Sequence, residues 1–200
     1  MRHLEAITED EMVAHFLQTE IRSVRFEETI LDLLRKAGKD RRVIDQPDLG
    51  NEAENAYRSG LLGEWRGYKR GEGIFRFVPD DTAWHRYALS HKELARVRYI
   101  DYDYWIELSG GTRRAIDAVP RIRAGIKVFG QYDTEWALGL AREVERGARF
   151  PDLILVGTGA SSDLTVLEGH ARLTAYCLAL EHVPEPLPVI VGFGAGMQRV

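Results

Sequence analysis

Apolar side chains recur every three or four positions through the first third of the sequence, a spacing typical of amphipathic helices. The pattern predicts a helix that begins after Thr8, where Thr8 and Glu11 have the spacing of a capping box. Two further helices are predicted over roughly residues 26–37, with Gly38 at the end, and residues 52–65. We expect these helices to pack as a layer over a sheet.

In the second half of the chain, apolar runs of strand length alternate with helical spacing. Buried strands are predicted at residues 152–156, 164–167 and 188–192, and a helix is predicted at about 134–146. The small residues 158–163 form a predicted hairpin between the first two of these strands.

These elements predict an α+β fold, with helices dominating residues 1–66 and a small mixed sheet in the C-terminal half. We expect a helical N-terminal region over residues 1–97 and an α+β domain over residues 98–200, packed as one compact unit. The 200 residues, 44% of them hydrophobic, are enough for one substantial core or one core with a small appended subdomain.

The middle of the chain is less regular. A glycine-rich turn precedes a predicted short strand at 74–78, and Ser90 with Glu93 forms a second capping-box pattern that predicts a short helix ending near Val97. Residues 112–126 are spaced as a helix, either kinked at Pro120 or split into two pieces.

The most aromatic stretch, residues 98–111, predicts a strand at 104–108. Asp101 and Asp103 would face the same way on an extended backbone, where they could bind a divalent cation or share a proton, or lie on a solvated edge. The neighbouring aromatic rings could stack on a base or serve only in core and rim packing; they are Tyr99, Tyr102, Tyr104 and Trp105.

Charge and cysteine content narrow the function classes. The net charge of −4 argues against a general nucleic-acid binder, although most basic residues are arginines that suit local anion sites. Cys177 is the only cysteine, so an intrachain disulfide is impossible. Because no apolar run is long enough for a membrane span and the N-terminus is not signal-like, we expect a cytoplasmic protein without a membrane partner.

The junction at Gly169 is the strongest candidate site. A predicted strand ends at Glu168, and a helical face, Leu173 to Leu180, begins just after Arg172. Gly169 permits a sharp turn, and the free N–H groups of the new helix, flanked by His170 and Arg172, would attract an anion.

This stretch resembles the signature turn of the ParB/sulfiredoxin superfamily, in which a strand runs into G-x-[RH]-R or G-C-H-R and then into a helix. Gly169 falls on the family glycine, Arg172 on the arginine, and His170 on the variable second position. Ala171 occupies a position that is usually basic, which removes one phosphate contact. The resemblance covers about the last 70 residues, and it implies a ParB/sulfiredoxin-like fold whose turn holds nucleotide phosphates.

The resemblance implies a nucleotide- or phosphate-binding protein, either a nucleotide-dependent phosphotransferase or hydrolase, or a non-catalytic ligand-sensing or protein-interaction module. Its ligand would be a small anion or a nucleotide triphosphate with Mg²⁺, and a homo-oligomer stays open. Glu168 and His170 are the candidate catalytic residues, and Glu168 could instead pair with Arg172. The candidate ligand-binding residues are Gly169, His170, Arg172 and Thr174.

Two activities of the superfamily find no support in the sequence. A sulfiredoxin-type reductase needs a cysteine at the turn, where this chain has His170, and Cys177 lies on the apolar stripe of the helix. Centromere binding by ParB needs a helix-turn-helix domain after the signature, and only about 20 residues follow Leu180.

Overall fold

A computed structural model describes all 200 residues, apart from the side chain of Gln198. It confirms an α+β fold with a mixed sheet. The strands are β1 (Arg2–Ala6), β2 (Ala83–Leu89), β3 (Leu153–Gly157), β4 (Thr165–Glu168) and β5 (Leu187–Phe193). The helices are α1 (Glu9–Glu20), α2 (Glu27–Lys36), α3 (Arg42–Asp45), α4 (Glu52–Arg66), α5 (His91–Leu94), α6 (Asp103–Leu108), α7 (Ala115–Arg123), α8 (Glu135–Glu145) and α9 (His170–Leu178). Short 3-10 turns are η1 (Gly73–Phe75), η2 (Leu180–His182) and η3 (Met197–Arg199).

The sheet has the strand order β1-β2-β5-β3-β4. Strand β5 pairs in parallel with β3, and the other neighbours are antiparallel. Strands β3 and β5 are central and buried on both faces, which explains why their sequences are continuous apolar runs. The sheet joins both halves of the chain, since β2 pairs with β5 along its whole length.

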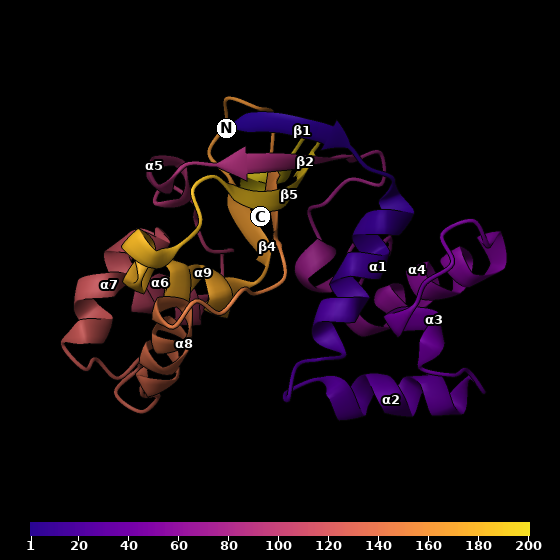
Figure 1. Cartoon of the computed structure of the whole chain (residues 1–200), viewed down its shortest axis with the longest axis horizontal. Helices are drawn as coiled ribbons and strands as arrows, with labels where there is room; N and C mark the ends of the chain where they lie inside the picture. The colour runs from indigo at the N-terminus through magenta and orange to yellow at the C-terminus, as the bar shows by residue number, and fades with distance from the viewer.

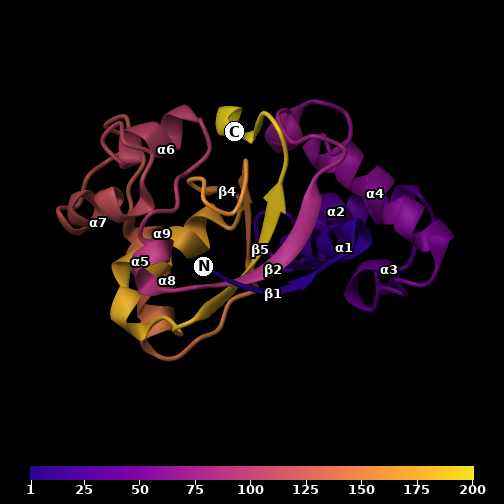
Figure 2. The ribbon, with the colours of Figure 1, turned by 90° about the horizontal axis from the view of Figure 1, so that it is seen from above.

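Helices cover the two faces of the sheet as separate layers. Helices α1 to α4 lie on one side and α5 to α9 on the other, with the sheet between them in both views (Figure 1 and Figure 2). Ile154 and Val156 of β3 join the core under α1 and α4, whereas Leu153 and Leu155 join the core under α8 and α9. The alternating side chains of one strand therefore tie the two cores together.

Several predicted elements are confirmed with small changes of boundary. Both capping boxes form, at Thr8 with Glu11 and at Ser90 with Glu93. The predicted helices near 26–37, 52–65 and 134–146 are α2, α4 and α8. Helix α7 contains Pro120 within one continuous segment.

The sequence prediction is wrong in the middle of the chain. The predicted strand at 104–108 is helix α6, which spans residues 103–108. The predicted strand at 74–78 does not form, and residues 73–75 make the 3-10 turn η1. Short apolar runs do not distinguish strand from helix, and Asp103 in the first turn of α6 favours the helix by its charge. Asp101 and Asp103 therefore do not share one side of a strand, and both are exposed.

Strands β1 and β2 extend the sheet into the N-terminal half, where the sequence pattern predicts helices and one short strand at 74–78 but neither of these two strands. Strand β1 is exposed along its whole length, so no apolar pattern marks it in the sequence. Strand β2 carries His85 and Arg86 between its apolar residues, which masks its alternation. Within the described residues, no helix has both the length and the apolar character needed to cross a membrane.

Candidate functional site

The turn between β4 and α9 is built around Gly169, as the sequence predicts. Gly169 has φ of 100°, in the region that favours glycine. A Cβ atom there would lie 2.6 Å from Leu153 Cδ2 and 3.0 Å from Arg172 Nη2. Glycine is therefore required both by the backbone conformation and by the side chains folded over it.

Arg172 is buried and bonded within the protein. Its guanidinium forms an ion pair with Glu168, and Nη1 donates to the carbonyl oxygens of Pro151 at 2.6 Å and Asp152 at 3.1 Å. These contacts tie the first turn of α9 to the end of β4 and to the start of β3. The pairing with Glu168, one of the two roles proposed from the sequence, is the one formed here.

Glu168 is the only acidic side chain among the candidate residues of the turn. Burial raises the pKa of its carboxyl, while Arg172 lowers it. Its carboxylate accepts a hydrogen bond from Arg172. A carboxylate held in this way is poorly placed to take a proton from a substrate or to hold a metal ion on a nucleotide.

His170 begins α9 and lies in a stack of aromatic rings. Its ring is 5.1 Å from the Trp105 ring at an interplanar angle of 17° and 6.3 Å from the Tyr99 ring at 13°, and the Tyr99 and Trp105 rings are 4.7 Å apart. The Nε2 atom of His170 is shielded from solvent and has no hydrogen-bond partner among the described residues. A polar atom of this kind favours a ligand or a water that can bond to it.

The electrostatic environment keeps His170 neutral. Burial, followed by the positive charges of Arg172 and Arg66, lowers the pKa of His170 to about 3. His170 is therefore neutral in the free protein near pH 7. A neutral imidazole can still donate a hydrogen bond through Nε2–H.

Thr174 lies one turn further along α9 and is fully buried. Its hydroxyl donates to the His170 carbonyl oxygen at 2.8 Å and lies 2.6 Å from the Tyr99 hydroxyl. Thr174 therefore supports the turn and the aromatic stack from beneath, and its hydroxyl is already engaged in internal hydrogen bonds.

The first backbone N–H groups of α9 are unpaired. No described residue accepts a hydrogen bond from the backbone N–H of His170, Ala171 or Arg172. The N–H of Leu173 is the first to be bonded, to the Gly169 carbonyl at 2.8 Å. These donors and the positive end of the helix dipole give the turn the character of an anion site.

Two charged residues from the opposite layer complete the site, and no pattern in the sequence points to them. Glu20 of α1 is buried and accepts hydrogen bonds from Arg66 at 2.5 Å and from Trp65 at 3.0 Å. Arg66 of α4 is close enough to lower the pKa of His170. These residues approach the turn only because α1 and α4 pack on the sheet. Tyr99 and Trp105, in contrast, belong to the aromatic stretch for which the sequence allows either a stacking platform or core and rim packing.

The surface hollows of the N-terminal layer do not coincide with the turn. One, of about 220 Å³, is lined by residues 64–67 and 72–74. It includes Arg66, the residue that also approaches His170. Another, of about 290 Å³, lies between α1 and α4 beside Lys69. Both are shallow and open. The described residues contain no group of three or more His, Cys, Asp or Glu side chains suited to a metal ion. We therefore base the candidate site on unpaired donors and charge, not on cavity size.

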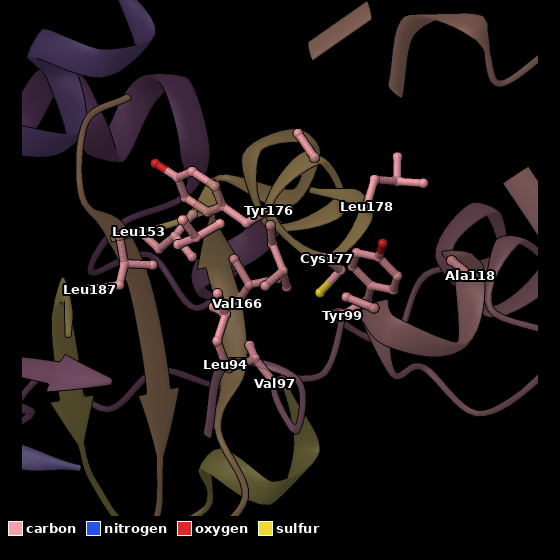
Figure 3. Close-up of a cluster of buried hydrophobic side chains, with 14 of the residues drawn as sticks. Leu94, Val97, Tyr99, Ala118, Leu153, Val166, Tyr176, Cys177, Leu178 and Leu187 are labelled. Carbon is pink, nitrogen blue, oxygen red and sulfur yellow. The ribbon is translucent and has the colours of Figure 1, made fainter. Parts of the chain in front are cut away.

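Cys177 lies in the apolar cluster beneath α9, beside Tyr99 and Val166 (Figure 3). The predicted burial of this thiol is confirmed, and burial raises its pKa to about 12. We expect native protein to react with a thiol reagent only on the timescale of unfolding. Cys177→Ser should lower the free energy of unfolding by about 1–3 kcal/mol, the cost of burying a hydroxyl. Complete labelling of the native protein within seconds would contradict this prediction.

Comparisons with models of known protein families, with curated proteins and with solved structures return no match to this chain. The superfamily resemblance of the turn thus rests on the sequence motif, and the chemistry of the site rests on its own residues.

Proposed function

We propose that this protein binds a small phosphate-bearing ligand, most simply a nucleotide, at the Gly169 turn, and that it acts as a binding module. The observation that carries the proposal is the set of unsatisfied donors gathered there. These are the first three N–H groups of α9 and the Nε2 atom of His170. A buried polar atom such as His170 Nε2 is unfavourable without a partner, and a bound phosphate oxygen would relieve that cost while accepting from the backbone N–H groups.

The charge around the turn supports an anion over a neutral ligand. Two guanidinium groups, from Arg66 and Arg172, contribute to the depressed pKa of His170, which indicates a positive potential at its ring. An anion placed at the helix N-terminus would lower that potential. The resemblance of the turn to the ParB/sulfiredoxin signature, whose turn holds nucleotide phosphates, supports the same ligand class.

Ligand entry requires a side chain to move, because His170 Nε2 is shielded from solvent. We expect Arg66 to make this movement. Its side chain is 20% exposed, and its Nε atom has no partner among the described residues. If the Arg66 guanidinium moved from Glu20 to the phosphate, its paired N–H groups could bond two phosphate oxygens. The corresponding groups of Arg172 are already bonded within the protein.

The state of Glu168 favours binding over turnover. A phosphotransferase or hydrolase of this type would use an acidic residue to activate the attacking group or to hold Mg²⁺ on the nucleotide. The carboxylate of Glu168 is instead paired with Arg172. We therefore propose that Arg172 and Glu168 fix the shape of the turn, while the backbone and His170 contact the ligand.

Isothermal titration with ADP and ATP, each with and without Mg²⁺, tests the proposal. We expect binding in the absence of Mg²⁺, and His170→Ala should weaken it by about 1.5–3 kcal/mol, the range for a hydrogen bond to a charged group. His170→Gln should recover part of the affinity, because its side-chain amide can place a donor near the position of Nε2.

His182→Ala is the matched control, since His182 is exposed on η2 and should leave affinity unchanged. Absence of binding by either nucleotide, or equal affinity in His170→Ala and the unmodified protein, would rule out this site. Hydrolysis of ATP by the purified protein, lost in Glu168→Gln, would favour an enzyme over a binding module.

A further inference from the structure

Two histidines lie side by side on the far edge of the sheet from the Gly169 turn. His3 comes from the edge strand β1 and His85 from its neighbour β2. The Nε2 atom of His3 and the Nδ1 atom of His85 are 3.3 Å apart. In the free protein, one of these nitrogens donates a hydrogen bond to the other.

The register of the two strands brings the histidines together and removes a carboxylate. His3 pairs with Tyr87, but Glu5 pairs with Arg86 and Ala6 with His85, because the register shifts between His3 and Glu5. Without this irregularity, Glu5 would lie opposite His85. Glu5 instead forms an ion pair with Arg86 at 3.3 Å, and Arg86 belongs to the opposite face of the sheet, where it bonds Asp152.

The surroundings hold the two imidazoles while leaving them open to solvent. The rings of Tyr87 and His3 meet edge to face at 5.2 Å, and the rings of His85 and Phe193 lie 6.0 Å apart. His3 is exposed and His85 is half-buried. Burial and the neighbouring His3 lower the pKa of His85, which favours its neutral form.

We propose that His3 and His85 form a binding site for a divalent transition-metal ion, with Zn²⁺ as the simplest occupant. Imidazole nitrogens suit Zn²⁺, Ni²⁺ and Cu²⁺, whereas Mg²⁺ and Ca²⁺ require oxygen ligands. The site does not depend on anion binding at Gly169.

The separation of the two nitrogens already fits this coordination. Zn–N bonds of about 2.0–2.1 Å in tetrahedral geometry place two ligand nitrogens about 3.3–3.4 Å apart. Binding replaces the hydrogen bond between the rings, and the ring that had donated it changes tautomer, its proton moving through solvent to the ring nitrogen that faces away from the metal. Water would complete the coordination sphere on the exposed side, because the site has two protein ligands and Glu5 is turned away.

Isothermal titration calorimetry of the intact protein with ZnCl₂ tests the site. We expect one Zn²⁺ per chain, and either His3→Ala or His85→Ala should weaken binding at least about tenfold, because a second ligand held in place raises the effective concentration. His182→Ala is the matched control, since it removes an exposed histidine from η2 and should leave affinity unchanged.

His3 lies on an exposed edge strand, so His3→Ala should fold normally, which circular dichroism can verify. Retention of full Zn²⁺ affinity by folded His3→Ala would overturn the proposal. The same conclusion would follow if the unmodified protein bound no Zn²⁺, or if affinity fell in His182→Ala as much as in His3→Ala.

Discussion

Arg172→Ala should lower the free energy of unfolding by about 3–5 kcal/mol, the range for breaking a buried ion pair by removing one partner. The substitution leaves the buried carboxylate of Glu168 without its counter-charge and removes a donor from the carbonyl oxygens of Pro151 and Asp152. Both side chains of the pair are largely shielded, at 10% and 14% exposure, so solvent cannot replace the lost interaction. Urea denaturation at neutral pH would measure the loss.

A surface ion pair provides the comparison. Arg96 pairs with Asp163 at 3.3 Å, and both side chains are exposed, so Arg96→Ala should change the free energy of unfolding by no more than about 1 kcal/mol. Arg172→Lys should recover only part of the loss, because an ammonium group cannot bond the carboxylate and both carbonyls in one plane.

The outcome for Arg172 also bears on its part in ligand binding. The sequence alone suggests that Arg172 contacts the anion, in which case Arg172→Ala would weaken nucleotide binding by about 1.5–3 kcal/mol with little loss of stability. The internal contacts of Arg172 predict instead a large loss of stability and a small direct effect on nucleotide binding. An Arg172→Ala protein that keeps its stability in urea would show that the guanidinium is free for ligand.

Gly169→Ala is the second substitution for which we expect a large effect, a loss of about 2–4 kcal/mol in the free energy of unfolding that combines backbone strain with overpacking. The strain arises because φ of 100° is unfavourable for alanine. The overpacking arises because the new methyl group would lie 2.6 Å from Leu153 Cδ2 and 3.0 Å from Arg172 Nη2. Thermal unfolding followed by circular dichroism would report both together.

Gly159 in the β3–β4 hairpin is the matched control. It has an ordinary φ, and a methyl group added there would meet no neighbouring atom of the described residues within 4 Å. Gly159→Ala should therefore be neutral or slightly stabilising. If Gly169→Ala melts at the same temperature as Gly159→Ala, then the turn is less tightly packed than its geometry indicates.

The turn itself could be predicted from the sequence because its signals are local. Glu168, Gly169, His170 and Arg172 are neighbours in the chain, so a strand, a glycine and a helical stripe sufficed to bring them together. Their partners could not be predicted. Arg66 and Glu20 reach the site from α4 and α1, more than 100 residues away along the chain, and no pattern in the sequence marks such an approach.

The same distinction separates the elements that the sequence predicts from those that it does not. Helices that begin with a capping box can be predicted, because the box requires particular residues at a fixed spacing. Strands β3 and β5 can be predicted because burial on both faces requires a continuous apolar run. Strand β2 forms by pairing with β5, and β1 forms by pairing with β2. Helix α6 forms where a short aromatic run permits either a helix or a strand.

The sequence by itself determined the α+β class, the Gly169 turn and the buried position of Cys177, since each follows from residue type and spacing. Only the tertiary structure decided which groups at the turn are free. It pairs Arg172 with Glu168, leaves His170 Nε2 without a partner among the described residues, and sets His3 beside His85. Hydrogen bonds between distant residues depend on how the layers pack, and that packing is a property of the whole chain rather than of any segment.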